Sequence, residues 1–409
     1  MLRLYTLNAE GAHIGPTNIG KMKKRVAVVV EIQAQLGVYH AVLNRVKHLR
    51  EVANYDIDVF LICIYDGFIM RWLRGCKPQL SLPQSFTDQG VPMTTCRVKR
   101  SWRNAIAHRL WGGAPKQLTA QLSLLAHRLN NYQLISAHDR IAGLVAQEAS
   151  RLYNVPYFIT WHGSSIHTDP ANDAMVRLET MELLHKATGH FFVSQNLLAC
   201  ARQLCPNLEG VVLPNGASSL FYRYSAKKRA ELRHRFGIEK DEKVVAYVGR
   251  FAPIKNTTLL PAIFCAIQEK CDRALKFWTV GDGPQHHAVE KMLQNEKIDC
   301  KMWGQQPASH MPNFMNCIDL LVLPSLKEGQ PLVCLEAMAC GACVVATDVG
   351  GTAECIGQDN VIALDEHLVE GMAQRAITLL GGKARQEPNP KCNGVTTAQK
   401  ENKIYQQYL

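Results

Sequence analysis

The sequence predicts an α/β protein of two domains, each with a parallel β-sheet covered by helices on both faces. The chain has 409 residues, which is longer than one hydrophobic core usually spans. Apolar runs rich in β-branched residues alternate with helix-like segments, and this alternation starts afresh in the second half. A hydrophobic content of 47% with 20% charged residues is typical of a globular protein.

The first alternating series begins at "KRVAVVVE" and ends at "GVVLPNG". We expect its helices at 37–52, 117–132 and 141–153. We expect its strands at 24–31, 58–65, 134–138, 156–163, 190–194 and 210–216.

The second series begins at "KVVAYVGR". We expect its strands at 243–250, 276–283, 301–305, 319–325 and 343–349, and a helix at 331–341. The polar stretch "LPNGASSLFYRYSAKKR" marks the boundary between the series. We therefore expect an N-terminal domain over 22–215, a C-terminal domain over 216–395, and a disordered extension over 1–21 before the strand-like start at Met22.

The positive charge is concentrated in the first half. The net charge is +11, and residues 71–116 hold nine basic residues against a single acid, with three tryptophans among them. Such a segment suits an anionic membrane surface or a partly lipidic anionic ligand, and a merely solvated basic face is the alternative. We find no nucleic-acid-binding motif and expect no nucleic-acid partner. Fourteen scattered cysteines favour reduced thiols in the cytoplasm.

No stretch reaches the length of a membrane-spanning helix, and the first residues lack the apolar core of a signal peptide.

The stretch "LPSLKEGQPLVCLEAMACG" (323–341) predicts a ligand site. It reads as a buried strand, a loop and a helix that begins with Pro331. Free amides at the helix start, including those of Leu332 and Val333, suit a phosphate. Glu328 and Glu336 flank this anion site, and carboxylates suit hydroxyl groups, so a sugar nucleotide is a fitting ligand. Glutamates near a helix start are also favourable for the helix dipole alone, which is the structural alternative.

Further loops follow strands at the same expected edge of the second sheet. Glycines there let a ligand approach the backbone, and Arg and Lys neutralise phosphate. The loops contribute Gly249, Arg250 and Lys255, then Gly281 and Asp282, and finally Gly350, Gly351 and Glu354.

The ordered series "GRFAPIKN", "VGDGP", "PSLKEGQPLVCLEAMACG" and "ATDVGGTAE" resembles the donor domain of GT-B glycosyltransferases. It is similar to the retaining "group 1" (family 4) enzymes that use nucleotide-diphosphate sugars, over about 244–380. In the first half, "ITWHG" and "VLPNGASSLF" fit this family, and "QLGVYH" stands at its acceptor loop. The resemblance implies two Rossmann-like domains whose parallel sheets face each other across a cleft. It also implies that a final helix, 396–409, packs back on the first domain.

The resemblance also implies residue roles. Arg250 and Lys255 would hold the diphosphate, Glu328 would contact donor-sugar hydroxyls, and Glu336 the ribose hydroxyls. His162 would face the sugar from the other domain. The remaining expected contacts are Gly249, Gly281, Asp282, Gly329, Gln330, Pro331, Leu332 and Val333 on the donor side, and Gly37 and His138 on the acceptor side.

The expected activity is transfer of a sugar with retention of configuration to a glycan or lipid-linked acceptor. We expect no cofactor and no required metal, because Arg250 and Lys255 can offset the charge of the diphosphate. The resemblance to this family also implies a role in a surface-polysaccharide pathway and a cytoplasmic location, at the inner face of the membrane. The alternatives are a GT-B sugar-nucleotide epimerase and a catalytically silent sugar-nucleotide-binding subunit.

Two short motifs are expected to be structural. "DID" (Asp56 to Asp58) resembles a metal-binding Asp-x-Asp motif but precedes its strand instead of following it. "CGAC" (Cys340, Cys343) has no second cysteine pair, so we interpret it as packing.

Overall fold

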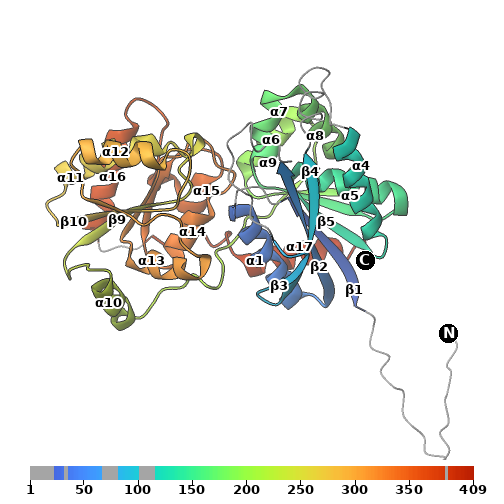
Figure 1. Ribbon diagram of the computed structural model, residues 1–409, viewed down its shortest axis with the longest axis horizontal. Helices are drawn as coiled ribbons and strands as arrows, with labels where there is room; N and C mark the ends of the chain where they lie inside the picture. Colours follow the sequence, from blue (N-terminus) through green and yellow to red (C-terminus); the bar gives the residue numbers. More distant parts are fainter. Residues whose placement is uncertain (1–22, 32–35, 67–81, 101–115, 383–385) are drawn as a thin grey trace, which may run out of the picture.

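A computed structural model describes residues 23–31, 36–66, 82–100, 116–382 and 386–409. It contains two α/β domains that lie side by side (Figure 1). The predicted fold class is confirmed, because each domain is built on a predominantly parallel sheet. The expected extension 1–21 and most of the basic segment 71–116 lie outside the described residues.

The N-terminal sheet has eight strands in the order β3-β4-β2-β1-β5-β6-β7-β8. All neighbours pair in parallel except β3 and β4, which form an antiparallel hairpin that the sequence did not predict. Each strand run expected in this half overlaps an observed strand, although β2 and β7 begin earlier than predicted. The strands are β1 (Lys24–Glu31), β2 (Tyr55–Asp66), β3 (Ser85–Asp88), β4 (Val91–Arg100), β5 (Leu134–His138), β6 (Tyr157–Trp161), β7 (Gly189–Phe192) and β8 (Val211–Val212).

Helices cover both faces of this sheet, and the side chains of each strand alternate between the two faces. Ala27 and Val29 pack on one face, whereas Val26, Val28 and Val30 pack on the other, and all five are buried. The helices are α1 (Leu36–Val52), α4 (Lys116–Ala126), α5 (Asp139–Tyr153), α6 (Ser164–His167), α7 (Asp169–Asn172), α8 (Ala174–Lys186) and α9 (Gln195–Leu204).

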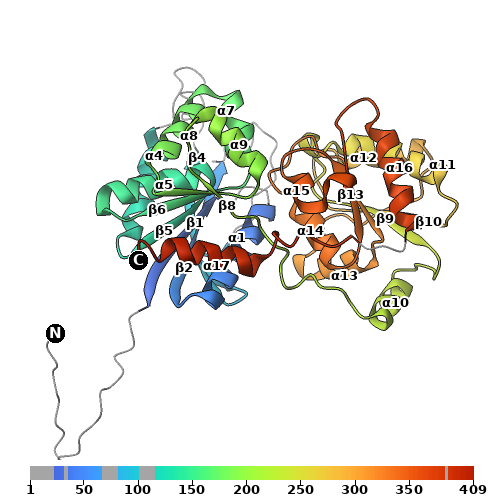
Figure 2. The same ribbon diagram turned by 180° about the vertical axis from the view of Figure 1, so that it is seen from behind.

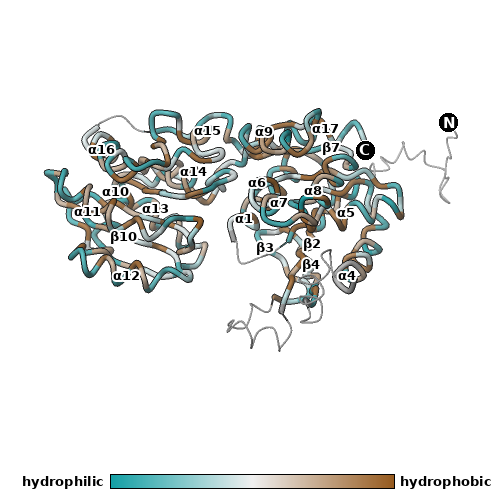
Figure 3. The backbone as a smooth tube through the Cα atoms, turned by 90° about the horizontal axis from the view of Figure 1, so that it is seen from above, coloured by the Kyte–Doolittle hydropathy of each residue, from teal (hydrophilic) through white to brown (hydrophobic). Residues whose placement is uncertain are grey.

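The C-terminal sheet has six parallel strands in the order β11-β10-β9-β12-β13-β14. Its strands are β9 (Lys243–Val248), β10 (Leu275–Val280), β11 (Cys300–Met302), β12 (Leu320–Leu323), β13 (Cys343–Thr347) and β14 (Val361–Ile362). Its helices are α10 (Ala226–Arg235), α11 (Leu260–Lys270), α12 (His286–Asn295), α13 (Met311–Cys317), α14 (Leu332–Ala339), α15 (Thr352–Ile356) and α16 (Leu368–Gly381). In Figure 3 the central strands are coloured as hydrophobic and the outer loops as hydrophilic, as expected for sheets buried on both faces.

The last helix, α17 (Gly394–Tyr405), returns to the N-terminal domain and lies beside α1 (Figure 2). Ala398 and Tyr405 are fully buried in the core that β1 and α1 share. The Thr397 hydroxyl donates a hydrogen bond to the carbonyl of Pro214 (2.6 Å). The chain therefore crosses between the domains twice, near Asn215 and near Cys392.

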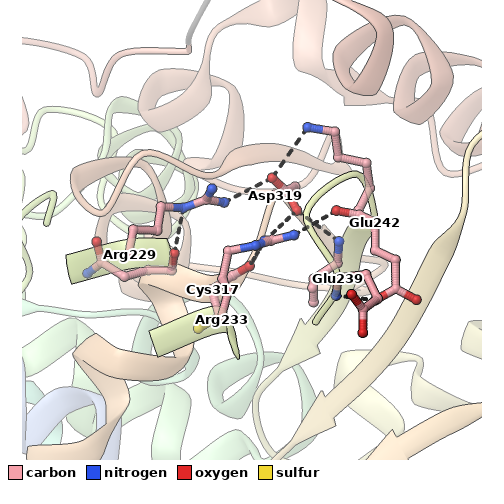
Figure 4. Close-up of polar contacts among 9 residues, drawn as sticks. Arg229, Arg233, Glu239, Glu242, Cys317 and Asp319 are labelled. Atoms are coloured by element: carbon pink, nitrogen blue, oxygen red, sulfur yellow. Dashed lines mark hydrogen bonds and ion pairs between the residues drawn. The ribbon is translucent and has the colours of Figure 1, made fainter. Parts of the chain in front are cut away.

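A partly buried ion network fixes α10 to the C-terminal sheet (Figure 4). Arg229 and Arg233 each lie 2.9 Å from a carboxylate oxygen of Asp319, which precedes β12. The same carboxylate accepts a hydrogen bond from the N–H of Val244 in β9 (2.9 Å). Burial raises the pKa of Asp319, but the two guanidinium groups outweigh it and hold the pKa below its usual value.

The two short motifs lie away from the strand ends expected to bind ligand. Asp58 accepts hydrogen bonds from Arg25 (3.1 Å) and from the Tyr132 hydroxyl (2.6 Å) at the beginning of β2. Cys340 is buried at the end of α14, and Cys343 begins β13. The surroundings of both motifs are thus typical of a structural role.

Candidate active site

The candidate site lies where the C-terminal sheet reverses its strand order. From β9 the chain continues to β10 and β11 on one side, whereas β12, β13 and β14 extend on the other side. The loops after β9 and β12 therefore start next to each other, which is the usual ligand-binding position in open parallel sheets. The N–H of Leu326 donates to the carbonyl of Ile254 (2.9 Å) and joins the two loops directly.

Lys255 and Glu328 meet at this point. The Lys255 Nζ lies 2.6 Å from Glu328 Oε1, and the same oxygen accepts a hydrogen bond from the Ser325 hydroxyl (2.6 Å). The Glu328 side chain is only 9% exposed, so its charge depends on these partners. Arg250 is exposed on the same loop, and its carbonyl accepts a hydrogen bond from Tyr247 (2.8 Å).

The glycine-rich loops after β9 and β10 pack edge to edge. Gly249 donates to the carbonyl of Val280 (2.9 Å), and Gly281 donates to that of Gly304 (2.8 Å). A side chain at Gly281, with φ of +130°, would place its Cβ 2.0 Å from the Gly249 oxygen. Asp282 stabilises its own turn, because its carboxylate accepts from the N–H of Gly283 (2.7 Å).

Helix α14 provides the expected amides and the second acid. Pro331 is the residue before the helix, not its first residue as predicted. The amides of Leu332 and Val333 occupy the first turn, where an α-helix supplies no acceptor. Glu336 follows within the helix, and its carboxylate has no hydrogen bond or ion pair in the part of the chain described here. Burial raises the pKa of Glu336 to about 7.

The loop between Glu328 and α14 contacts the N-terminal domain. A Cβ at Gly329 would lie 1.8 Å from the carbonyl oxygen of His162, so only glycine allows this approach. The Gly329 carbonyl also accepts from the N–H of Gly351 (3.1 Å). The Gln330 side chain binds the backbone of Asn215 at the domain crossover, so this predicted donor-site residue uses its side chain elsewhere.

His162 follows β6 and faces this loop from the other domain. Its Nε2 lies 2.9 Å from Nδ1 of His138, and the two rings are stacked. Burial, assisted by the charge of Arg45, lowers the pKa of His162 to about 3, so the ring is neutral near pH 7. His138, the partner of His162, is 2% exposed, and Gly37 is exposed in the first turn of α1.

Sequence reasoning missed the contacts through which side chains connect distant segments, including those of Glu354, which was predicted only as a loop residue. Glu354 accepts hydrogen bonds from the backbone N–H groups of Gln195 (2.8 Å) and Asn196 (3.1 Å), so α15 of one domain contacts the start of α9 in the other. Ser325 ends an apolar run in the sequence, but no sequence pattern predicts its contact with Glu328. For Arg45, the sequence predicts only a position in an expected helix.

Two family models match the chain. One, for glycosyl transferases group 1, matches residues 242–381, and the other, for a glycosyl transferase 4-like domain, matches residues 36–216. The chain belongs to the group 1 glycosyltransferases. The two matches correspond to the two observed domains, and the first contains Arg250, Lys255, Glu328 and Glu336.

Relatives of this glycosyltransferase include proteins of polysaccharide biosynthesis. TuaC of Bacillus subtilis (strain 168), provisionally named a teichuronic acid biosynthesis glycosyltransferase, is 26% identical over 84% of each chain. The HepE protein of Anabaena, solved with UDP and glucose, has a TM-score of 0.68 at 18% identity over 94% of this chain and 100% of its own. Sucrose-phosphate synthase from Thermosynechococcus elongatus also has a TM-score of 0.68 at 18% identity, over 94% and 99% of the two chains. Both solved structures share the GT-B fold.

Two features are absent from the described residues. None of their helices combines the length and hydropathy needed to cross a bilayer. No cluster of three or more His, Cys, Asp or Glu side chains among them is placed to hold a metal ion.

Proposed function

We propose that this glycosyltransferase transfers a sugar from a nucleotide-diphosphate sugar to a glycan or lipid-linked acceptor, with retention of configuration. The proposal rests on the arrangement of charged side chains and free amides around the start of α14. Glu328, paired with Lys255, precedes the amides of Leu332 and Val333 along the chain, and Glu336, which has no partner among the described residues, follows them one turn into α14. A cation and amides suit a diphosphate, and the two acids suit the hydroxyls of the sugars at its two ends.

The charge balance supports departure of the diphosphate. Lys255 is neutralised by Glu328 in the free protein, and Arg250 is exposed to solvent beside it. A bound diphosphate would bring negative charge to both cations, and the charge grows as the bond to the sugar breaks. Stabilisation of such developing charge by fixed donors commonly lowers a barrier by about 3–4 kcal/mol.

The chemical step proposed breaks the bond between the anomeric carbon and the phosphate oxygen. The acceptor oxygen forms its bond on the same face of the sugar, and the acceptor proton passes to an oxygen of the departing phosphate. Arg250 and Lys255 supply the positive charge for this step, so we propose that no divalent metal is required. His162, neutral near pH 7, would contact the sugar without adding charge.

The acceptor is proposed from the relatives and from the basic segment. The TuaC name places that relative in teichuronic acid biosynthesis. Within segment 71–116, Arg97 and Lys99 have described side chains, and both are exposed on one face of β4 while Cys96 and Val98 are buried. We propose that this face meets the anionic inner surface of the membrane, where a lipid-linked acceptor is found.

Turnover with analysis of the product tests the proposed reaction. The purified protein is incubated with UDP-, GDP- and ADP-sugars and a series of lipid-linked and free glycan acceptors. The anomeric configuration of the product is read by NMR. We expect one nucleotide class to be consumed and the donor configuration to be kept. An inverted product, or transfer only after a metal ion is added, would contradict the proposed mechanism.

Vesicle sedimentation tests the membrane contact separately. At physiological salt we expect binding to vesicles that contain anionic lipid and not to neutral vesicles. Arg97→Gln with Lys99→Gln should weaken this binding, whereas Lys270→Gln, on the other domain, should not. Equal binding of both variants would reject this surface.

A further inference from the structure

Helix α15 of the C-terminal domain binds the start of α9 in the N-terminal domain. The Glu354 carboxylate accepts hydrogen bonds from the backbone N–H groups of Gln195 (2.8 Å) and Asn196 (3.1 Å). These are the first two residues of α9, and α9 and α15 lie next to each other where the domains meet (Figures 1 and 3). An acid of one domain thus caps a helix of the other.

This contact joins groups of complementary charge. The first N–H groups of an α-helix have no acceptor within the helix, and a helix start carries a partial positive charge. Helix α9 also has a cap of its own, because the Ser194 hydroxyl oxygen accepts a hydrogen bond from the N–H of Leu197 (3.2 Å). The helix start is therefore capped without Glu354, and the bonds to Glu354 add a connection between the domains.

The turn before α15 packs on the loop between Glu328 and α14, the donor loop. The N–H of Gly351 donates to the Gly329 carbonyl (3.1 Å). A Cβ at Gly350 would lie 1.6 Å from the carbonyl oxygen of Glu328, and a Cβ at Gly351 would lie 2.5 Å from the Cβ of Ser194. The turn therefore lies in close contact with the donor loop on one side and with the residue before α9 on the other.

The donor loop also meets the N-terminal domain directly, at the close approach of Gly329 to the His162 carbonyl. Its position relative to that domain thus depends on two contacts. One is the packing of Gly329 on His162, and the other is the pair of bonds from Glu354 to α9, which acts through the turn at Gly350 and Gly351.

We propose that Glu354 is a positioning residue for sugar transfer, because its bonds to the start of α9 hold the donor loop against His162. This inference rests on the proposed function. There the donor sugar lies between Glu328 and His162, so transfer requires the two domains in this arrangement. The nucleotide contacts residues of the C-terminal domain alone. Loss of the bonds to α9 should therefore lower kcat and leave the affinity for the nucleotide unchanged.

The test uses a variant on each side of the contact. Glu354→Ala removes the acceptor, and Glu354→Gln keeps an acceptor oxygen without the charge. Gln195→Pro removes one of the two donors. Proline suits this position, because Gln195 is the first residue of α9 and Ser194 before it is extended (φ −151°, ψ 158°). Gln195→Ala changes the same side chain but keeps the N–H, and it is the matched control.

Hydrogen exchange of the Gln195 and Asn196 amides, without substrate, measures the contact itself on the full-length protein. We expect exchange to be about tenfold faster or more in Glu354→Ala, because both amides lose a charged acceptor. Glu354→Gln should give a smaller increase. Gln195→Ala should exchange like the native protein.

Kinetics measure the consequence for transfer. We expect kcat to fall about tenfold in Glu354→Ala and by a smaller factor in Gln195→Pro. Calorimetry with UDP, GDP and ADP should give a Kd for the nucleotide that binds within about twofold of the native value in both variants. The double variant should be no slower than Glu354→Ala alone, because the two changes remove the same contact.

Faster exchange and a lower kcat, with an unchanged nucleotide Kd, support the inference. Unchanged exchange in Glu354→Ala overturns it. A native kcat despite faster exchange overturns the link to the reaction, as do additive effects in the double variant. A nucleotide Kd that weakens in parallel with kcat also overturns it, because the nucleotide site itself is then damaged.

Two further results are separated by this design. If Glu354→Ala does not fold, Glu354→Gln and Gln195→Pro provide the same comparison. Absence of any sugar transfer by the native protein counts against the proposed function, and hydrogen exchange still decides whether Glu354 binds the start of α9.

Discussion

The side-chain amide of Gln330 forms two hydrogen bonds with the backbone of Asn215. The Asn215 N–H donates to Oε1 (2.7 Å), and Nε2 donates to the Asn215 carbonyl (3.2 Å). The same Nε2 contacts the sulfur of Cys392 (3.5 Å) on the second crossover. One side chain of the donor loop thus contacts both segments that connect the domains, so a movement of this loop is coupled to both crossovers.

Gln330→Ala should loosen this coupling. We expect a loss of stability of about 1–3 kcal/mol, because two backbone groups of Asn215 lose their partners. We also expect KM for the donor to rise, since the loop is less well ordered before binding. Chemical denaturation and donor kinetics measure the two effects. Gln358→Ala, which removes an exposed hydrogen bond to Asp348, is the matched control. Identical denaturation curves for the two variants would reject this role of Gln330.

Lys255→Met should reduce turnover strongly. The variant removes the cation beside Glu328, and loss of a donor that stabilises developing charge commonly costs about 100- to 1,000-fold in kcat. Release of nucleoside diphosphate from the donor measures the effect. Lys270→Met removes a similar lysine from the exposed pair with Glu370 and should leave turnover unchanged. A kcat for Lys255→Met within twofold of the native value would exclude Lys255 from the chemical step.

Glu336→Gln should stabilise the free protein at high pH. The pKa of Glu336 is raised from about 4.5 in the unfolded chain to about 7 in the folded protein, so the folded state binds the proton more tightly. The resulting destabilisation is absent below pH 4.5, grows as the pH rises through 7, and is complete above it. We expect Glu336→Gln to gain about 1–3 kcal/mol at pH 8 and nothing at pH 4.

Urea denaturation at the two pH values measures this difference. Glu370→Gln, an exposed glutamate on α16, is the control and should show no such pH dependence. A gain for Glu336→Gln that is equal at pH 4 and pH 8 would show that ionisation of Glu336 is not its cause.

Asp319→Asn should destabilise the C-terminal domain. The change leaves Arg229 and Arg233 without their buried counter-charge, and breaking such a pair commonly costs about 3–5 kcal/mol. Because the pKa of Asp319 is held low in the folded state, its contribution is present above its unfolded pKa of about 3.8 and is lost as the pH falls through the lower folded value. Denaturation curves of the native protein and the variant should therefore converge as the pH falls below 3.8. A constant difference at all pH values would contradict this account.

The fold could be predicted because most of its strands are short runs of buried, apolar residues. Val244 to Val248 in β9, for example, are all buried, and β-branched residues dominate parallel strands covered on both faces. The hairpin of β3 and β4 was missed because Arg97, Lys99 and Arg100 made β4 read as a charged segment, although Met93, Cys96 and Val98 are buried. The strand β14 has two residues, too few to form a pattern.

The candidate site was predictable in its residue types but not in its contacts. Lys255 and Glu328 follow strand ends, and Glu336 lies in the helix after the second of them. Parallel strands bring such ends together. The partners Asn215 of Gln330 and Gln195 of Glu354 lie 115 and 159 residues away in the sequence, and no local periodicity encodes such contacts. Only the structure therefore shows that the Gln330 side chain binds the domain crossover.

A thermal-shift screen against UDP-, GDP- and ADP-sugars, with Glu336→Ala measured in parallel, tests the central claim most directly. A ligand at about 100 times its dissociation constant stabilises the folded state by about 2.7 kcal/mol, which is readily detected. The account predicts that one nucleotide class stabilises the native protein and that Glu336→Ala responds less. No stabilisation by any of them, or equal stabilisation of the variant, would contradict a nucleotide-sugar site at the start of α14.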